Sequence, residues 1–112
     1  MTKKKQQPLN HTDFFEARFP GKLVGKEVLD KDSRRLGIIK AIRVEYLPWN
    51  VSLIIKGLNV ELPVNFSEVE SIGTVVILKT RISVFPEIDI NNLITLREEV
   101  KEDLKDIFHE PI

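Results

Sequence analysis

The fold is decided by residues 21–79, GKLVGKEVLDKDSRRLGIIKAIRVEYLPWNVSLIIKGLNVELPVNFSEVESIGTVVILK, which contain all five glycines of the chain. Short runs rich in Val, Ile and Leu alternate here with clusters of turn-forming residues, a pattern typical of consecutive β-strands. Residues 49–56 are the clearest case, because apolar side chains occupy every second position from Trp49 to Ile55. Closely spaced strands of this kind indicate a small barrel or half-open barrel.

We expect a mainly β protein in which about six strands form this barrel over residues 20–84. The predicted strands cover residues 22–29, 36–46, 49–56, 58–62 and 74–79, and residues 81–84 are the candidate for one more. The alternation of apolar residues slips within 36–46, which predicts a bulge or a strong bend there. The stretch Val64–Ser71 suits a helical turn that crosses the barrel.

The two ends of the chain have a different character. From Asp89 to Phe108, apolar residues recur at spacings of three and four, so we expect an amphipathic helix within residues 85–112, with Asp89 or Asn91 as its N-cap. Residues 1–19 begin with a polar segment that contains a Lys triplet, and we expect them to form a flexible basic arm. The three phenylalanines of that arm are expected to close the core; they are Phe14, Phe15 and Phe19.

The charge of the chain is balanced overall but divided unevenly. Lys and Arg together number 17, as do Asp and Glu, whereas residues 85–112 contain three basic and eight acidic residues. An acidic tail beside a mildly basic body argues against general nucleic-acid binding, which uses a concentrated basic surface. It allows self-association in which the tail of one chain contacts the body of another.

Few residues in this chain are suited to catalysis or to binding a metal. The chain has no cysteine, and its two histidines, His11 and His109, lie at opposite ends, so we expect no metal site and no cofactor. No nucleophile stands beside a base, and no carboxylates are paired within the strand-rich region, so we do not expect an enzyme. No apolar stretch approaches the roughly 20 residues of a membrane span, which leads us to expect a cytoplasmic protein.

Three stretches of the sequence, taken in order, resemble the PRC-barrel family. They are LVGKEVLD at residues 23–30, RLGII at 35–39, and ELPV at 61–64 followed by VESIGTVVIL at 69–78. The family takes its name from the H subunit of photosynthetic reaction centres, and it includes a domain of a bacterial ribosome-maturation factor and an archaeal cell-division protein. The resemblance implies a six-stranded barrel and a non-enzymatic adaptor, archaeal in origin, acting in cell division or cytoskeletal assembly.

Two sets of residues are candidates for contact with a protein partner. The first is Tyr46, Leu47 and Trp49, because aromatic side chains exposed on a loop form docking hot spots; burial of Trp49 in the core is the competing expectation. The second is the apolar stripe of the C-terminal helix, formed by Leu93, Leu96, Val100, Leu104, Ile107 and Phe108. Such a helix needs a partner surface. That surface is its own barrel, a second copy in a homodimer, or a foreign protein.

An RNA-associated or ribosome-associated barrel is the alternative function. Its contacts with phosphate would come from five basic residues on a turn and a strand, together with the arm residues Lys3–Lys5. The five are Lys31, Arg34, Arg35, Lys40 and Arg43. Interleaved acidic residues weaken this field, and an ordinary solvated surface is the simpler interpretation.

Overall fold

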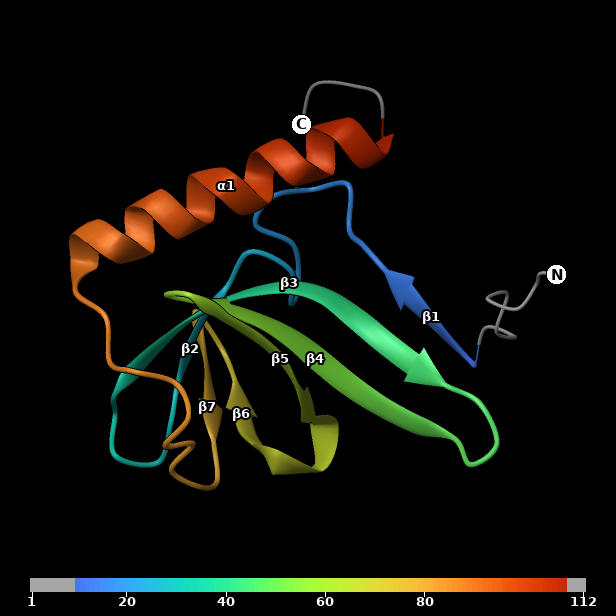
Figure 1. Ribbon diagram of the computed structural model, residues 1–112, viewed down its shortest axis with the longest axis horizontal. Coiled ribbons are helices and arrows are strands. Elements are labelled where there is room, and N and C mark those ends of the chain that lie inside the picture. Colours follow the sequence, from blue (N-terminus) through green and yellow to red (C-terminus); the bar gives the residue numbers. More distant parts are fainter. Residues whose placement is uncertain (1–9, 109–112) are drawn as a thin grey trace, which may run out of the picture.

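The computed structural model describes residues 10–108 and contains seven strands, one short 3₁₀ turn and one helix. The strands are β1 (His11–Phe14), β2 (Glu27–Leu29), β3 (Arg35–Glu45), β4 (Asn50–Gly57), β5 (Val60–Asn65), β6 (Val69–Ile72) and β7 (Val75–Leu78). The turn η1 (Phe66–Glu68) lies between β5 and β6, and the helix α1 (Ile90–Phe108) follows the sheet (Figure 1). The predicted fold class, mainly β with a C-terminal helix, is confirmed.

All seven strands belong to one mixed sheet. Its order is β5–β4–β3–β2–β7–β6, and β1 pairs with β3 beside this path. The pairing of β2 with β7 is parallel, and the other ladders are antiparallel. Within residues 10–108 no ladder joins β5 to β6, so the sheet is not closed into a barrel.

The long strand β3 holds the sheet together because it has different neighbours along its length. Its first residues pair with β2, and its last residues, from Ile42 to Glu45, pair with β1. On its other side it pairs with β4, and the register shifts between Ile39 and Ala41. The predicted bulge within residues 36–46 is therefore confirmed, and it lies where β3 passes from one neighbour to the other.

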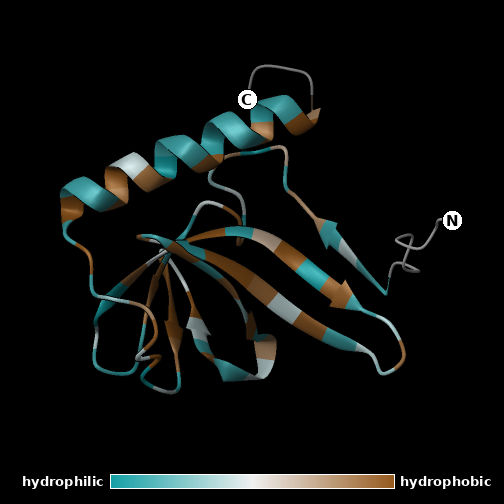
Figure 2. Ribbon diagram, in the orientation of Figure 1, coloured by the Kyte–Doolittle hydropathy of each residue, from teal (hydrophilic) through white to brown (hydrophobic). Residues whose placement is uncertain are grey.

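Helix α1 lies along one side of the sheet and closes the core (Figure 1). Asp89 caps it, because its side chain accepts a hydrogen bond from the amide of Asn92 at 2.9 Å. Hydrophilic residues cover much of the helix, and hydrophobic segments interrupt them in the pattern of an amphipathic helix (Figure 2). Lys56 of β4 reaches Glu99 of the helix at 3.3 Å, and Arg97 reaches the carbonyl of Gly25 at 3.4 Å.

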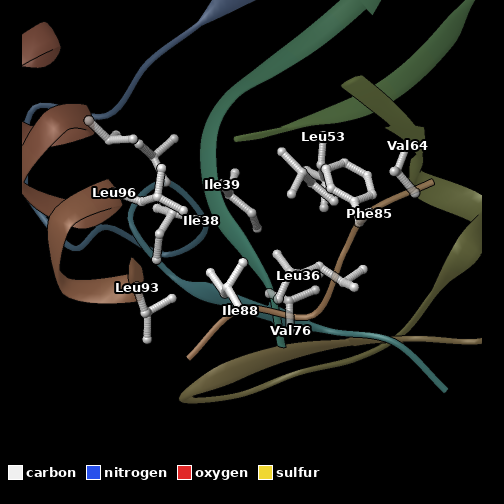
Figure 3. Packing of buried hydrophobic residues seen from close by; sticks show 14 of the residues in the cluster. Leu36, Ile38, Ile39, Leu53, Val64, Val76, Phe85, Ile88, Leu93 and Leu96 are labelled. Carbon is white, nitrogen blue, oxygen red and sulfur yellow. The ribbon is translucent and has the colours of Figure 1, made fainter. Parts of the chain in front are cut away.

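The core is one continuous cluster between the sheet, the helix and the segment that connects them. Phe85, from this connecting segment, is fully buried and lies beside Leu53 and Val64 (Figure 3). Gly57 permits the close packing, because a Cβ at that position would lie 2.8 Å from both the Leu36 carbonyl oxygen and the Phe85 ring. The cluster also contains Val24, Val28, Leu36, Ile38, Ile39, Ile55, Val76, Leu78, Ile88, Leu93, Leu96, Val100 and Leu104.

Two acidic side chains fix the loops that border this core. Both Glu16 carboxylate oxygens accept backbone hydrogen bonds, from the amides of Lys22, Leu23 and Val24, each at 2.8 Å. Asp30 is buried and pairs with Arg34 at 2.9 Å, and Arg34 also donates to the carbonyl of Phe85. These contacts are local or involve loops, so strand periodicity does not reveal them.

Three predictions about individual elements are wrong. Residues 11–14, expected in the flexible arm, form β1, because the Asp13 carboxylate and the backbone of this segment find partners on β3. Residues 81–84 form no strand. The expected helical turn over residues 64–71 is reduced to the three residues of η1, and the residues after it form β6 instead. The rest of the predicted arm includes residues 1–9, which lie outside the described residues.

Candidate docking surface

The turn that joins β3 to β4 carries the most exposed large apolar side chains of the described chain. Leu47 is 86% exposed and Trp49 is 71% exposed. Leu47 also has a positive φ of 49°, a conformation that residues with a Cβ rarely adopt. The expectation that Trp49 is buried in the core is therefore wrong, and this turn projects away from α1 (Figure 1).

Strand β4 explains why the pattern of alternation misplaced Trp49. Trp49, Val51, Leu53 and Ile55 follow one face of the strand, as their spacing predicts. Ile55 and Leu53 are fully buried, whereas Val51 is 38% exposed and Trp49 is more exposed still. The β3–β4 hairpin therefore extends beyond the core, and its apolar face continues into solvent.

Tyr46 holds Trp49 in place. The two rings meet edge to face, with centroids 5.3 Å apart and an interplanar angle of 86°. The Tyr46 hydroxyl is hydrogen-bonded to the hydroxyl of Thr12 on β1. The exposed indole is thus packed against a side chain that is itself anchored, which lowers the entropy that Trp49 would lose on binding a partner.

The neighbouring strand β1 enlarges the apolar surface. Phe14 pairs with Ile42 and Thr12 pairs with Val44, so their side chains lie on the same face as those of Val51 and Trp49. Phe14 is 51% exposed. We call this surface the hairpin patch; it consists of Phe14, Tyr46, Leu47, Trp49 and Val51.

The opposite face of the same strands carries charged side chains, among them the ion pair of Asp13 and Arg43. The Arg43 guanidinium donates to both oxygens of Asp13, at 2.7 and 3.0 Å. This hydrogen bonding lowers the pKa of Asp13 and raises the pKa of Arg43. The pair fixes β1 on β3, and the hairpin patch itself contains no charged residue.

The apolar stripe of α1 is mostly part of the core. Leu93, Leu96, Val100 and Leu104 are buried against the chain's own sheet, so these four predicted partner-binding residues are not available to another protein. Ile107 remains 42% exposed, and Phe108 is half-buried against the core cluster. Of the three predicted surfaces for this helix, its own sheet is the one that the structure shows.

The predicted RNA-binding residues do not form a concentrated basic surface. Four of the five form ion pairs with acidic residues: Arg34 with Asp30, Arg35 with Glu27, Lys40 with Glu61 and Arg43 with Asp13. The fifth, Lys31, is exposed. Lys3–Lys5, which were expected to assist them, lie outside the described residues.

The prediction that Phe14 closes the core is wrong. We expected Phe14, Phe15 and Phe19 to close the core, and the last two are partly buried against it, whereas Phe14 belongs to the exposed face. Its position follows from the pairing of β1 with residues 42–45, which are about thirty residues away in the sequence. Nothing in the sequence around Phe14 signals that pairing.

A groove of about 370 Å³ lies between the end of α1 and the charged face of the sheet. Asp13, Lys40, Arg43 and Glu61 are among the residues that line it, and each of them is already in an ion pair. Across residues 10–108, no three His, Asp or Glu side chains are grouped so that they could hold a metal ion. The hairpin patch is therefore the strongest candidate for a functional surface.

Comparison with known proteins gives no family assignment, because the chain matches no protein-family model and no curated protein. The described part of the chain has no helix with the length and apolar character that crossing a bilayer requires.

Proposed function

We propose that this chain is a protein-interaction module that binds a partner protein through the hairpin patch. The observation that carries the proposal is the exposure of Trp49 and Leu47 at the tip of the β3–β4 hairpin. Monomeric proteins expose single apolar residues everywhere, but a contiguous apolar group built around an aromatic pair is typical of an interaction site.

The construction of the patch supports this use. Tyr46 and Trp49 present large, rigid surfaces, and the hydrogen bond to Thr12 restricts the Tyr46 ring before any partner arrives. Polar and charged side chains of the same strands, including His11, Glu45 and Asn50, lie on the opposite face, so the patch itself is uncharged.

We also propose that the fold is a half-open relative of the PRC barrel. The resemblance rests on residues 23–30, 35–39 and 61–78, and the strands within the first two of these stretches pair with each other as β2 and β3. The last residues of the third stretch form β7, which pairs with β2 from Glu27 to Leu29. The proposed role is that of an adaptor in cell division or cytoskeletal assembly, as the family resemblance suggests.

The test is a capture experiment with the full chain as bait in native extract. We expect one or more proteins to bind the wild-type chain and to be lost with the double variant Leu47→Ser, Trp49→Ala. The control is Ile94→Ser, which removes an apolar side chain of comparable exposure from the outer face of α1. Equal capture by the hairpin variant and the wild-type chain would contradict the proposal.

A further inference from the structure

The three outer edges of the sheet are unequally protected against pairing with another strand. Strand β5 carries Pro63, a residue that blunts an edge because it has no amide hydrogen. Strand β6 contains a register shift between Val69 and Ser71. Such an irregularity also makes an edge less able to pair with another strand. Strand β1 is short, but it has neither a proline nor a register shift.

The backbone groups on the free side of β1 can be identified from its pairing with β3. Asn10 accepts a hydrogen bond at 2.9 Å from the amide of Tyr46, the residue opposite it. Hydrogen-bonded pairs alternate along an antiparallel ladder, so Thr12 and Phe14 also direct their backbone groups toward β3. The amides and carbonyls of His11 and Asp13 therefore point outward, and no strand within residues 10–108 pairs with them.

We propose that the added strand is β1 of a second copy of this chain, which makes the protein a homodimer. Two antiparallel copies of β1 related by a two-fold axis pair His11 of each copy with Asp13 of the other. Each of these pairs can exchange both of its backbone hydrogen bonds. Thr12 then lies opposite its own counterpart on the symmetry axis.

Charge favours a second copy as the occupant of this edge. His11 and Asp13 are two residues apart on one strand, so both side chains lie on the charged face, and the register places an imidazole opposite a carboxylate twice. On the other face the hairpin patch has no charge, so two copies of it can approach without repulsion. Phe14 of one copy then lies opposite Asn10 of the other copy, whose own neighbour across the β1–β3 ladder is Tyr46.

This inference goes beyond the proposed docking function, because the dimer uses the edge of β1 while the exposed faces of Tyr46 and Trp49 stay open. Dimerisation joins two hairpin patches into one surface. It also moves the predicted homodimer contact from the apolar stripe of α1, which lies in the core, to the edge strand β1 (Figure 1).

The first measurement is the mass of the full chain in solution by sedimentation equilibrium over a dilution series. We expect twice the monomer mass of 12.9 kDa for the wild-type chain. The variant His11→Pro removes one outward amide and leaves the Asn10–Tyr46 bond in place, and we expect dimerisation at least tenfold weaker. The matched variant His11→Thr keeps the amide, and its backbone pairing should preserve the dimer. Circular dichroism establishes that both variants are folded.

The second measurement tests the register itself. The natural chain has no cysteine, so Thr12→Cys introduces a single thiol on the two-fold axis, where opposed residues are within disulfide range. We expect rapid oxidation to a covalent dimer, and much slower oxidation for the control Ser71→Cys on the β6 edge. A wild-type chain that is monomeric at every concentration would overturn the proposal. So would a dimer that survives His11→Pro and gives no preferential link through residue 12.

These outcomes are independent of the docking proposal. Loss of partner capture in the hairpin variant, combined with a monomeric wild-type chain, would support docking and reject the dimer. The converse pair of results would support the dimer and reject docking. A monomer whose β1 edge binds a foreign extended segment would also reject the second copy as occupant.

Discussion

The apolar stripe of α1 and the hairpin patch have similar composition but opposite environments. Leu93, Leu96, Val100 and Leu104 of the stripe are buried against the sheet, whereas Leu47 and Trp49 of the patch are exposed. The stripe recurs at spacings of three and four along the helix, and Trp49 continues the alternation of Val51, Leu53 and Ile55 along β4. The comparison teaches that periodicity identifies an apolar face but does not say whether the rest of the chain is long enough to cover it.

Length and position account for the difference. Helix α1 is the last element of the described chain, and its stripe packs in the core cluster against the sheet. The β3–β4 hairpin projects beyond the core, and the short strand β1 pairs with it there. Within residues 10–108, the first face is therefore buried and the second remains largely exposed.

The largest expected effect is a loss of stability when the apolar stripe of α1 is shortened. We expect Leu104→Ala to lower the free energy of unfolding by about 2–5 kcal/mol, because it leaves a cavity between α1 and the sheet. The matched variant Ile107→Ala removes a half-exposed side chain one turn away and should cost less than about 1 kcal/mol. Urea unfolding measures both. Equal, small losses would mean that the stripe is not packed as described.

A second prediction concerns how acidic pH affects stability through Glu16, whose carboxylate holds the loop before β2. Partial burial raises the pKa of Glu16, but hydrogen bonds from the amides of Val24, Lys22 and Leu23 outweigh burial and hold the pKa below its usual value. A carboxylate of lowered pKa contributes stability that is present above its unfolded value, about 4.3, and is lost as the pH falls through its folded value.

We therefore expect Glu16→Gln to cost about 1–2 kcal/mol at neutral pH, because the backbone amides lose a charged acceptor. The variant should also show a weaker fall in stability below about pH 4 than the wild-type chain. Urea midpoints at pH 7 and pH 3 measure both effects. A wild-type pH dependence retained in full by the variant would show that Glu16 does not contribute to it.

The smallest expected effect on stability belongs to the hairpin patch. We expect Trp49→Ala to change the free energy of unfolding by no more than about 0.5 kcal/mol, because most of the indole is already in water. Together with loss of partner capture, this result would separate binding from folding. A loss comparable with that of Leu104→Ala would instead assign Trp49 to the core and remove the main support for docking.

Much of the fold could be predicted from the sequence because it depends on local pattern. The alternation after Trp49, the slip within residues 36–46 and the spacing of apolar residues after Asp89 correctly predicted a strand, a bulge and a capped helix. Strand β1 could not be predicted in this way. Three of its four residues are polar, and they become a strand because β3 offers them backbone partners and Arg43.

The candidate site could also be predicted only in part from the sequence. Tyr46, Leu47 and Trp49 could be named as docking residues because aromatic side chains stand in a turn. The exposure of Trp49 and the addition of Phe14 could not, because both depend on how far the hairpin extends past the core. The basic residues show the reverse case, since they look like a cluster until their acidic partners on other strands are seen.

By itself the sequence determined β3, β4, β5, β7 and the helix, since these follow from the spacing of apolar side chains and from caps and turns a few residues away. Only the tertiary structure decided which apolar face is covered, which charges are paired and which sheet edge is left open. Those outcomes depend on contacts between residues distant in the chain, where the finite area of the core, not local periodicity, decides which surfaces are buried.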